Sequence, residues 1–214
     1  CSAERGFKKA LTAPAPRRCL GHCLAGTPRA SDAPNALILP PVTVTLDPDT
    51  AHPQLVLSED GKRVRWGHTR QDLPNNPERF DTERCVLGRE GFTLGRHCWE
   101  VEVGDGGYWA VGVARESVWR KGGISYSSEG GIWAVQQWGN QFRALTSPVT
   151  PLTQSLVPSR IQVCLDCDWG LVTFFGAGDE APIFTFPPGF VPGERIQPWL
   201  WVGWDTNTHL RLCP

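Results

Sequence analysis

Residue types that could bind a metal gather first near the start of the sequence. Cys19, His22 and Cys23 lie close together, and Cys1 lies upstream of them. Thiolate and imidazole ligands at this spacing are typical of zinc sites, but a structural zinc site needs a second, properly spaced pair, which does not follow. We therefore expect no metal site. The alternative is that these residues are the remnant of an upstream zinc module.

Cys164 and Cys167 form a second candidate pair, at C-x-x-C spacing. They lie in an apolar run with strand character, and residues three apart in a strand point to opposite faces. The two side chains can therefore neither share a metal nor form an unstrained disulfide. Together with Cys85 and Cys98, which also lie in apolar runs, they are interpreted as free buried thiols. This placement predicts a reducing, intracellular setting.

Patterns typical of catalysis do not occur in the sequence. We find no G-x-S-x-G nucleophile elbow, no H-E-x-x-H motif and no P-loop. His52, His68, His97 and His209 each stand alone; His68 is interpreted as a loop residue and His97 as structural. We expect that this chain is not an enzyme and requires no cofactor.

Aromatic and basic residues at the ends of apolar runs are better candidates, and the chemistry they offer is binding. Trp138 lies beside Gly139-Asn140, and Trp204 begins the loop after another run, so both indoles could stand exposed. Exposed tryptophans are enriched among interface anchors; packing at the rim of the domain is the alternative for both. Arg115 could direct its guanidinium at a carboxylate or carbonyl of a peptide, or belong to a solvated basic loop.

The elements that must position these residues are β-strands. Short apolar runs recur about every 8–15 residues between turn signals, and no 3.6-residue apolar pattern persists for ten residues. Asp60-Gly61 and Gly139-Asn140 lie between paired runs and predict hairpins, which favour antiparallel sheets packed as a sandwich. The predicted strands are Leu55–Leu57, Arg63–Trp66, Cys85–Leu87, Trp99–Val103, Trp109–Val113, Ile132–Trp138, Gln141–Ala144, Ile161–Leu165, Leu171–Phe175, Ile183–Phe186, Trp199–Val202 and Leu210–Leu212.

Two of these predicted strands flank the turn at residues 104–107, which carries three glycines and one aspartate. Trp99 and Trp109 each begin an alternating apolar run, and we predict that both anchor the core, because burying an aromatic removes about 150–250 Å² from water. The other face of the second strand carries Ala110 and Gly112. Their small size indicates close approach by another sheet or by a ligand.

Residues 1–40 differ in composition from the rest of the chain. They are rich in Ala, Pro and Arg without a sustained period, which predicts a linker or a largely disordered tail. A net charge of −1 gives no electrostatic argument for nucleic-acid binding. No apolar run approaches the roughly 20 residues that span a bilayer, so no direct membrane insertion is expected. Because the chain begins with Cys1 and contains no Met, we expect a fragment of a longer protein.

A series of motifs runs from residue 41 to residue 214. The first is VTLDPDTAHPQLVLSEDGKRVRWG, which contains Leu46-Asp47-Pro48; the later ones are GRHCWEVEVG, YWAVGVARESVWRKG, IWAVQQWGNQFRALTSP, RIQVCLDCDWGLVTFF, PWLWVG and LRLCP. These motifs resemble the PRY-SPRY domain of tripartite-motif ubiquitin ligases and butyrophilins. The match places a PRY segment at residues 41–95 and a SPRY segment at 96–214. Leu165-Asp166-Cys167-Asp168 stands where the family usually has Leu-Asp-Tyr-Glu.

The resemblance implies an all-β fold for residues 41–214 as one structural domain. This fold is a bent antiparallel sandwich of two sheets, a concanavalin-like jelly roll. It also implies a non-catalytic module that binds a protein or peptide ligand. The family's ligand pocket includes the positions of Trp138, Trp204, Gln136 and Ala110. Members often have an aromatic or an acid at the last two positions, so the ligand is expected to differ here. The predicted partner-binding residues are Trp138, Trp204, Gln136, Ala110, Arg115 and Asn140.

For the parent protein, the resemblance implies substrate recognition by a tripartite-motif E3 ubiquitin ligase in the cytoplasm, with roles in innate immunity. A RING domain and a coiled coil that could dimerise the parent would then precede residue 1. The alternative is the cytoplasmic domain of a butyrophilin-type receptor. Some of these receptors sense a phosphorylated small molecule in a basic pocket, but this near-neutral sequence shows no dense cluster of Arg and His. A stand-alone scaffold or secreted SPRY protein is a third possibility.

Overall fold

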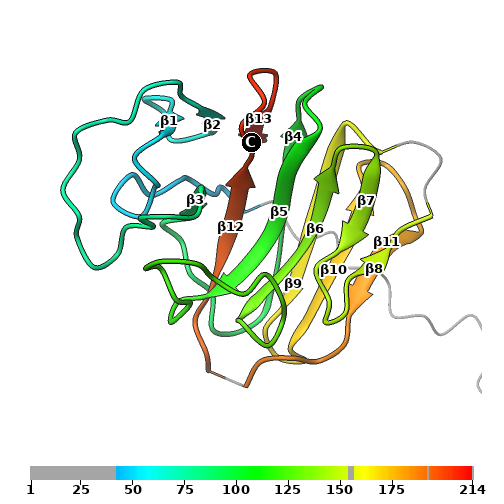
Figure 1. Cartoon of the computed structure of the whole chain (residues 1–214). Coiled ribbons are helices and arrows are strands. Elements are labelled where there is room, and N and C mark those ends of the chain that lie inside the picture. The colour runs from blue at the N-terminus through cyan, green and yellow to red at the C-terminus, as the bar shows by residue number, and fades with distance from the viewer. Residues whose placement is uncertain (1–41, 154–156, 192, 214) are drawn as a thin grey trace, which may run out of the picture. The chain divides into compact units, whose positions relative to one another are not determined.

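The computed structural model describes residues 42–153, 157–191 and 193–213, which contain β-strands and no helix (Figure 1). The predicted tail at residues 1–40 lies outside the described residues. The strands are β1 (Leu55–Leu57), β2 (Arg63–Trp66), β3 (Cys85–Leu87), β4 (Arg96–Val103), β5 (Tyr108–Arg115), β6 (Ile132–Trp138), β7 (Gln141–Ala144), β8 (Thr150–Pro151), β9 (Arg160–Asp166), β10 (Leu171–Gly176), β11 (Pro182–Phe186), β12 (Ile196–Val202) and β13 (His209–Leu212).

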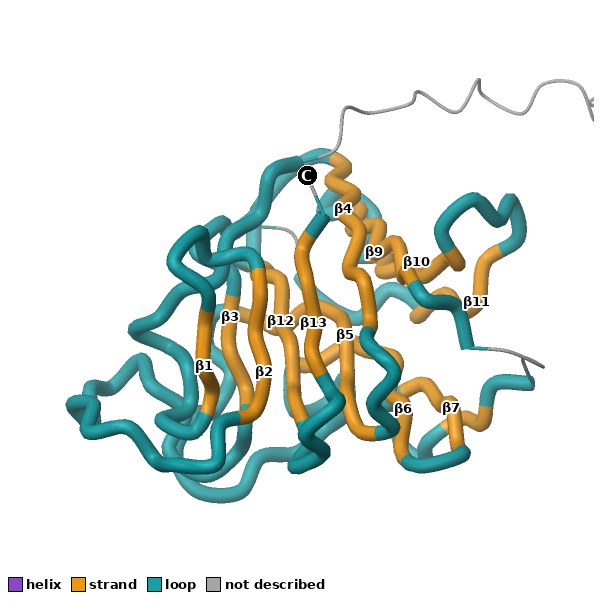
Figure 2. Tube along the Cα trace, turned by 90° about the horizontal axis from the view of Figure 1, so that it is seen from above, coloured by secondary structure: helices purple, strands orange, loops and turns teal. Residues whose placement is uncertain are grey.

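The strands form two sheets in which every pairing is antiparallel. One sheet has seven strands in the order β1-β2-β13-β4-β9-β10-β11, and the other has six in the order β3-β12-β5-β6-β7-β8. Figure 2 shows β1, β2 and β13 in a row, and β3 next to β12. The predicted all-β antiparallel sandwich is therefore confirmed. The strand β8 was not predicted, because its two residues carry no alternation that a sequence pattern could show.

The main core is built from the inward-facing residues of both sheets. Trp99 on β4 and Trp109 on β5 are 2% and 1% exposed, as their alternating runs predict. Trp133 on β6 joins them, and valine or leucine at every second position of the central strands completes the same cluster. Because strand side chains alternate between the two faces, Glu100 and Glu102 lie on the other side of β4 and stay partly exposed.

The outer face of the six-stranded sheet is buried as well. Trp201 and Trp199 of β12 stand directly opposite Ala110 and Gly112 of β5. Directly opposite residues share a face and lie next to each other, and Ala110 packs in one buried cluster with both indoles. At Gly112 a Cβ would collide with the Trp133 carbonyl oxygen and with Ala134 of β6. The loop between β5 and β6 covers this face, and the Tyr126 ring lies 6.0 Å from Trp199 and 6.4 Å from Trp201. The sequence indicated approach by another sheet or by a ligand; instead, indoles of the same sheet and this loop lie against this face.

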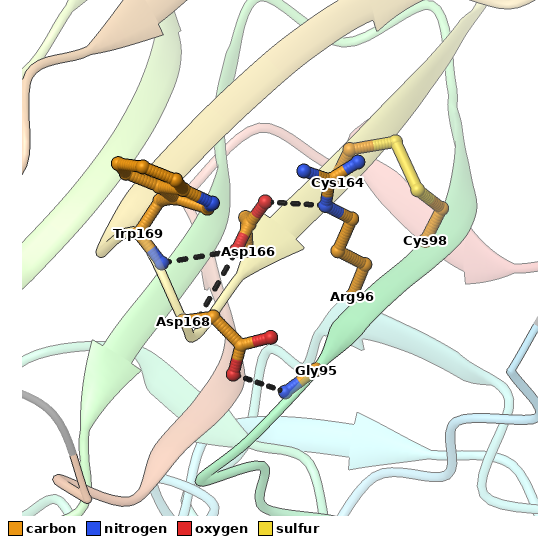
Figure 3. Close-up of polar contacts among 7 residues, drawn as sticks. All are labelled: Gly95, Arg96, Cys98, Cys164, Asp166, Asp168 and Trp169. Atoms are coloured by element: carbon orange, nitrogen blue, oxygen red, sulfur yellow. Dashed lines mark hydrogen bonds and ion pairs between the residues drawn. A yellow bond between two sulfur atoms is a disulfide. The ribbon is translucent and has the colours of Figure 1, made fainter. Parts of the chain in front are cut away.

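The interpretation of Cys98 and Cys164 as free thiols is wrong. The two residues are register partners on β4 and β9, with their Cα atoms 4.3 Å apart, and a disulfide joins them (Figure 3). That separation is typical of a directly opposite pair without backbone hydrogen bonds between its members, where side chains are closest. Cys85 and Cys167 are free and buried, as predicted. Two of the four cysteines that favoured a reducing setting are therefore paired.

Asp166 and Asp168 stabilise the turn between β9 and β10. Asp166 accepts hydrogen bonds from the N–H groups of Asp168 and Trp169, at 3.2 and 3.0 Å, and pairs with Arg96 on β4. Asp168 accepts the N–H of Gly95 at 2.9 Å (Figure 3). Short polar side chains that bond nearby backbone amides stabilise turns of this kind. The two carboxylates therefore hold the β9–β10 turn against the start of β4.

Replacing Trp99 should test the core assignment. We expect Trp99→Ala to lower the free energy of unfolding by about 3–5 kcal/mol, because it removes a buried aromatic and leaves a cavity. Trp169→Ala is the matched control: its side chain is 68% exposed, and the change should cost less than about 0.5 kcal/mol. Urea denaturation of both variants measures the difference. Equal losses would contradict the assignment.

Removing the disulfide should destabilise the domain. The bond closes a segment with a sequence separation of 66, and bonds that close long segments typically contribute about 2–4 kcal/mol. We expect thermal melting to shift downward on reduction, and Cys98→Ser/Cys164→Ser to show the lower value with or without reductant. Cys213→Ser, at a free and half-buried cysteine, is the control and should respond to reductant like the wild type. A wild-type melting curve that does not change on reduction would contradict this expectation.

Candidate functional site

Four aromatic rings from three strands and one loop meet at one end of the six-stranded sheet. Tyr108 is the first residue of β5, and Trp138 is the last residue of β6. Trp201 is the residue before the last in β12, and Trp204 lies in the loop after β12. Since these strands are antiparallel neighbours, the start of β5 lies beside the ends of β6 and β12. We call these four residues the aromatic cluster.

The rings of the aromatic cluster contact one another closely. Their centroids lie 4.9 Å apart for Tyr108 and Trp204, 5.4 Å for Tyr108 and Trp138, 5.5 Å for Trp138 and Trp204, and 5.8 Å for Trp138 and Trp201. Stacked and edge-to-face pairs at these distances are attractive beyond the area they bury. The cluster is thus a mutually supported group of rings, with limited freedom for each.

Gly203 allows Trp204 to join the cluster. Its N–H donates to the carbonyl oxygen of Tyr108 at 2.8 Å, which brings the chain after β12 directly against the start of β5. A Cβ at position 203 would collide with the Cβ of Tyr108. Only glycine permits this approach without a shift of the backbone.

Two of the four rings are available to a partner. Trp138 and Trp204 are 36% and 46% exposed, whereas Trp201 beneath them is 3% exposed. Neither exposed indole lies in the space between the sheets. The cluster therefore presents an aromatic surface on a rigid base, which is the arrangement of a binding anchor.

Two arginines frame this surface. The guanidinium carbon of Arg84 lies 5.4 Å from the Trp204 ring centroid, and that of Arg143 lies 5.4 Å from the Trp138 ring centroid. Both distances are within the range of cation–π attraction. Arg143 is fixed in place because its Nε and Nη2 donate to Oε1 of Gln136, at 2.9 and 2.7 Å.

The structure separates the predicted partner-binding residues into three groups. Trp138 and Trp204 lie together on the surface. Ala110 and Gln136 are register partners beneath it, 0% and 3% exposed, so they shape the site from below. Arg115 lies at the other end of β5, where its Nε is 3.4 Å from the Glu194 carboxylate, and it does not reach the aromatic cluster.

Asn140, the remaining predicted residue, lies in the β6–β7 turn after Gly139, whose φ of +60° favours glycine. It lines a hollow of about 370 Å³ together with the 104–107 turn and Pro158. This hollow adjoins the aromatic cluster in sequence, through Tyr108 and Trp138. The glycines of the 104–107 turn thus leave space at the rim of the sheet, and they carry no reactive side chain.

Sequence reasoning missed Tyr108, Trp201, Arg84 and Arg143 as members of the site. Arg84 precedes β3, and its carbonyl accepts the N–H of Val202 at 3.1 Å, which places its side chain beside Trp204. Arg143 stands opposite Gln136 in the β6–β7 ladder. The sequence could have placed Arg143, because a turn at Gly139-Asn140 fixes the register of the hairpin and sets Arg143 opposite Gln136. Nothing local could place Arg84, because β3 and β12 are far apart in the sequence.

His52 is buried near this end and remains uncharged. Burial, and next the positive charge of Arg70, lower the pKa of His52 to about 4; Arg84 contributes in the same direction. Its Nδ1 accepts the N–H of Gln54 at 3.1 Å, a bond that a protonated Nδ1 could not accept. The folded state therefore requires the neutral imidazole.

Stability should consequently depend on the protonation of His52. Between pH 6.5 and about 4 the unfolded chain binds a proton that the folded chain excludes, so the free energy of unfolding should fall as the pH falls, by up to about 3 kcal/mol. In His52→Asn the amide oxygen can replace Nδ1 as acceptor but does not titrate, so this component should disappear. Urea denaturation from pH 7 to 4 compares the two proteins. Parallel pH profiles would contradict the role of His52.

Two structural features relevant to function are not found in the described ranges. No group of three or more His, Cys, Asp or Glu side chains there is arranged to hold a metal ion. Within the same ranges, no helix has the length and apolarity to cross a bilayer. Cys1, Cys19, His22 and Cys23, the possible zinc remnant, lie outside those ranges.

Family models match most of the described chain. The model of the PRY, or SPRY-associated, domain matches residues 44–92, and the SPRY domain model matches residues 96–211. This chain belongs to the PRY-SPRY family. The PRY-SPRY chain is 46% identical to Butyrophilin subfamily 2 member A2 of Mus musculus over 173 residues, which cover 80% of the chain and 33% of that relative.

Other relatives include both butyrophilins and a zinc finger protein. Identity is 47% to Butyrophilin subfamily 1 member A1 of Homo sapiens over 173 residues, and 44% to Zinc finger protein RFP of Homo sapiens over 177 residues. Each match covers 81% of this chain and 33% or 34% of the relative, so the chain spans about a third of their length.

Solved structures share the fold. The TRIM65 PSpry domain has a TM-score of 0.68 at 22% identity, covering 80% of this chain and 89% of that one. Stonustoxin has a TM-score of 0.67 at 27% identity, covering 80% of this chain and 28% of that one. The resemblance that the motifs carried is thereby confirmed, in family and in fold.

Proposed function

We propose that the aromatic cluster is a protein-binding surface and that this PRY-SPRY domain is a recognition module without catalysis of its own. The observation that carries the proposal is the pair of exposed indoles, Trp138 and Trp204, held 5.5 Å apart on a buried base. Large, rigid aromatic side chains bury much area at little entropic cost, and they dominate binding energies at protein interfaces. A protein or peptide is the ligand class that such a surface fits.

In the parent protein, the module would recruit the substrate of a tripartite-motif E3 ubiquitin ligase in the cytoplasm. The similarity to Zinc finger protein RFP and to the TRIM65 PSpry fold supports this role. Ligase activity would then come from a RING domain elsewhere in the parent, and a coiled coil would pair two recognition modules. Innate immune recognition is the biological role we propose for such a ligase.

The alternative parent is a butyrophilin-type receptor, and identities of 46% and 47% to two butyrophilins favour it. In that case the same surface would bind a cytoplasmic partner of the receptor. The coding sequence upstream of residue 1 distinguishes the two parents. A RING finger supports the ligase, whereas immunoglobulin domains followed by an apolar run of about 20 residues support the receptor.

Truncating the exposed indoles should weaken partner binding. We expect Trp138→Ala and Trp204→Ala each to cost about 2 kcal/mol or more of binding free energy, roughly 30-fold in Kd. Trp119→Ala is the control: it removes an indole that is 68% exposed in the β5–β6 loop, outside the aromatic cluster. Partners captured with the wild-type domain and then purified provide the affinities. Unchanged partners and affinities after the double substitution would sink the assignment.

A further inference from the structure

A positively charged arginine lies over each of the two exposed rings of the aromatic cluster. Arg84 lies over Trp204 and Arg143 lies over Trp138, each at 5.4 Å, while the two indoles are 5.5 Å apart. An extended peptide advances about 3.4 Å per residue, so 5.4 Å corresponds to less than two residues of a peptide that rests on the ring. A bound segment would therefore meet both charges close to its apolar anchor.

Among the described residues, neither guanidinium forms an ion pair. The four ion pairs found in the described ranges use Arg96, Arg115, Arg160 and Arg195. The two acidic residues next in sequence to Arg84 and Trp204 form hydrogen bonds with other groups. The Glu83 carboxylate accepts the Tyr126 hydroxyl, and the Asp205 carboxylate accepts the N–H groups of Gly107 and Asn207, at 3.2 and 3.0 Å.

Both guanidiniums also retain donors for a ligand. Nε of Arg84 is buried, and no hydrogen bond among the described residues uses its terminal nitrogens Nη1 and Nη2, so these remain to bond a ligand. Arg143 is oriented by Gln136, which is 3% exposed, through Nε and Nη2 only, so Nη1 remains to bond a ligand. Planar guanidiniums held in this way match carboxylates better than they match neutral groups.

We propose that the aromatic cluster binds peptide segments in which an apolar or aromatic side chain lies within a few residues of Asp or Glu. The indoles take the apolar side chain, and Arg84 and Arg143 take the carboxylates. This specificity rests on the proposed function, because it names the ligand class of the same surface.

Selection from a displayed library of random 12-residue peptides tests the specificity. Four forms of the domain are compared: wild type, Arg84→Gln/Arg143→Gln, Arg84→Lys/Arg143→Lys, and Trp138→Ala/Trp204→Ala. We expect peptides selected by the wild type to contain at least about twice the input frequency of Asp and Glu, next to an apolar residue. The Gln form should lose this preference, whereas the Lys form should keep part of it, because lysine retains the charge. A purely structural role of the arginines would not be rescued by charge alone.

A single selected peptide then gives the magnitude. Changing its acidic residue to the corresponding amide should weaken binding to the wild type at least tenfold and leave binding to the Gln form nearly unchanged. Arg65→Gln, at an exposed arginine on β2, is the control and should bind like the wild type. Melting temperatures within a few degrees of the wild type show that each variant is folded.

The outcomes separate this inference from the proposed function. Suppose that the wild type selects apolar peptides without a surplus of Asp and Glu, and that the Trp138→Ala/Trp204→Ala form does not select them. This result would overturn the acidic specificity but would support the binding surface. Equal selection by the wild type and by that tryptophan variant would overturn both. An acidic surplus that persists in the Gln form would also overturn the role of the two arginines.

Discussion

The pairing of large side chains on β12 with small ones on β5 is the constraint on which the rest of the structure depends. Trp199 stands opposite Gly112, and Trp201 opposite Ala110. A register shift of one residue would turn both indoles toward the other sheet, because side chains alternate with a period of two. In the observed register, β12 ends beside the start of β5, and Gly203 can then bond Tyr108. The position of the aromatic cluster therefore follows from the packing that builds the sheet.

Local patterns were sufficient to predict the fold wherever a strand alternates on its own. Trp99 and Trp109 were placed in the core by alternation, and Gly139-Asn140 was placed in a turn by residue type. Pro198 shows where this reasoning fails. The strand was predicted from Trp199, yet β12 begins at Ile196 and contains Pro198, although proline is usually excluded from central strands. The Pro198 carbonyl still accepts the N–H of Gly88 at 2.8 Å, beyond the end of β3.

Features that depend on which strands become neighbours were harder to predict. Cys164 was predicted within a strand and Cys98 immediately before one, but their bond depends on the register of β4 against β9, which no pattern within either strand contains. The site shows the same limit. Trp138 and Trp204 could be named from their positions at strand ends, whereas Arg84 enters through long-range pairing. Ala110 and Gln136 were named through the family resemblance, and their burial became visible only in three dimensions.

The strand order has a consequence for how the chain can be divided. The stretch matched by the PRY model supplies β1 and β2 to one sheet and β3 to the other. In these sheets β2 pairs with β13, and β3 pairs with β12. Excising it would leave both of these strands with a bare row of backbone donors and acceptors, a template for pairing with other chains. The residues matched by the two family models therefore pair within the same two sheets, and strands of the first stretch cover sheet edges of the second.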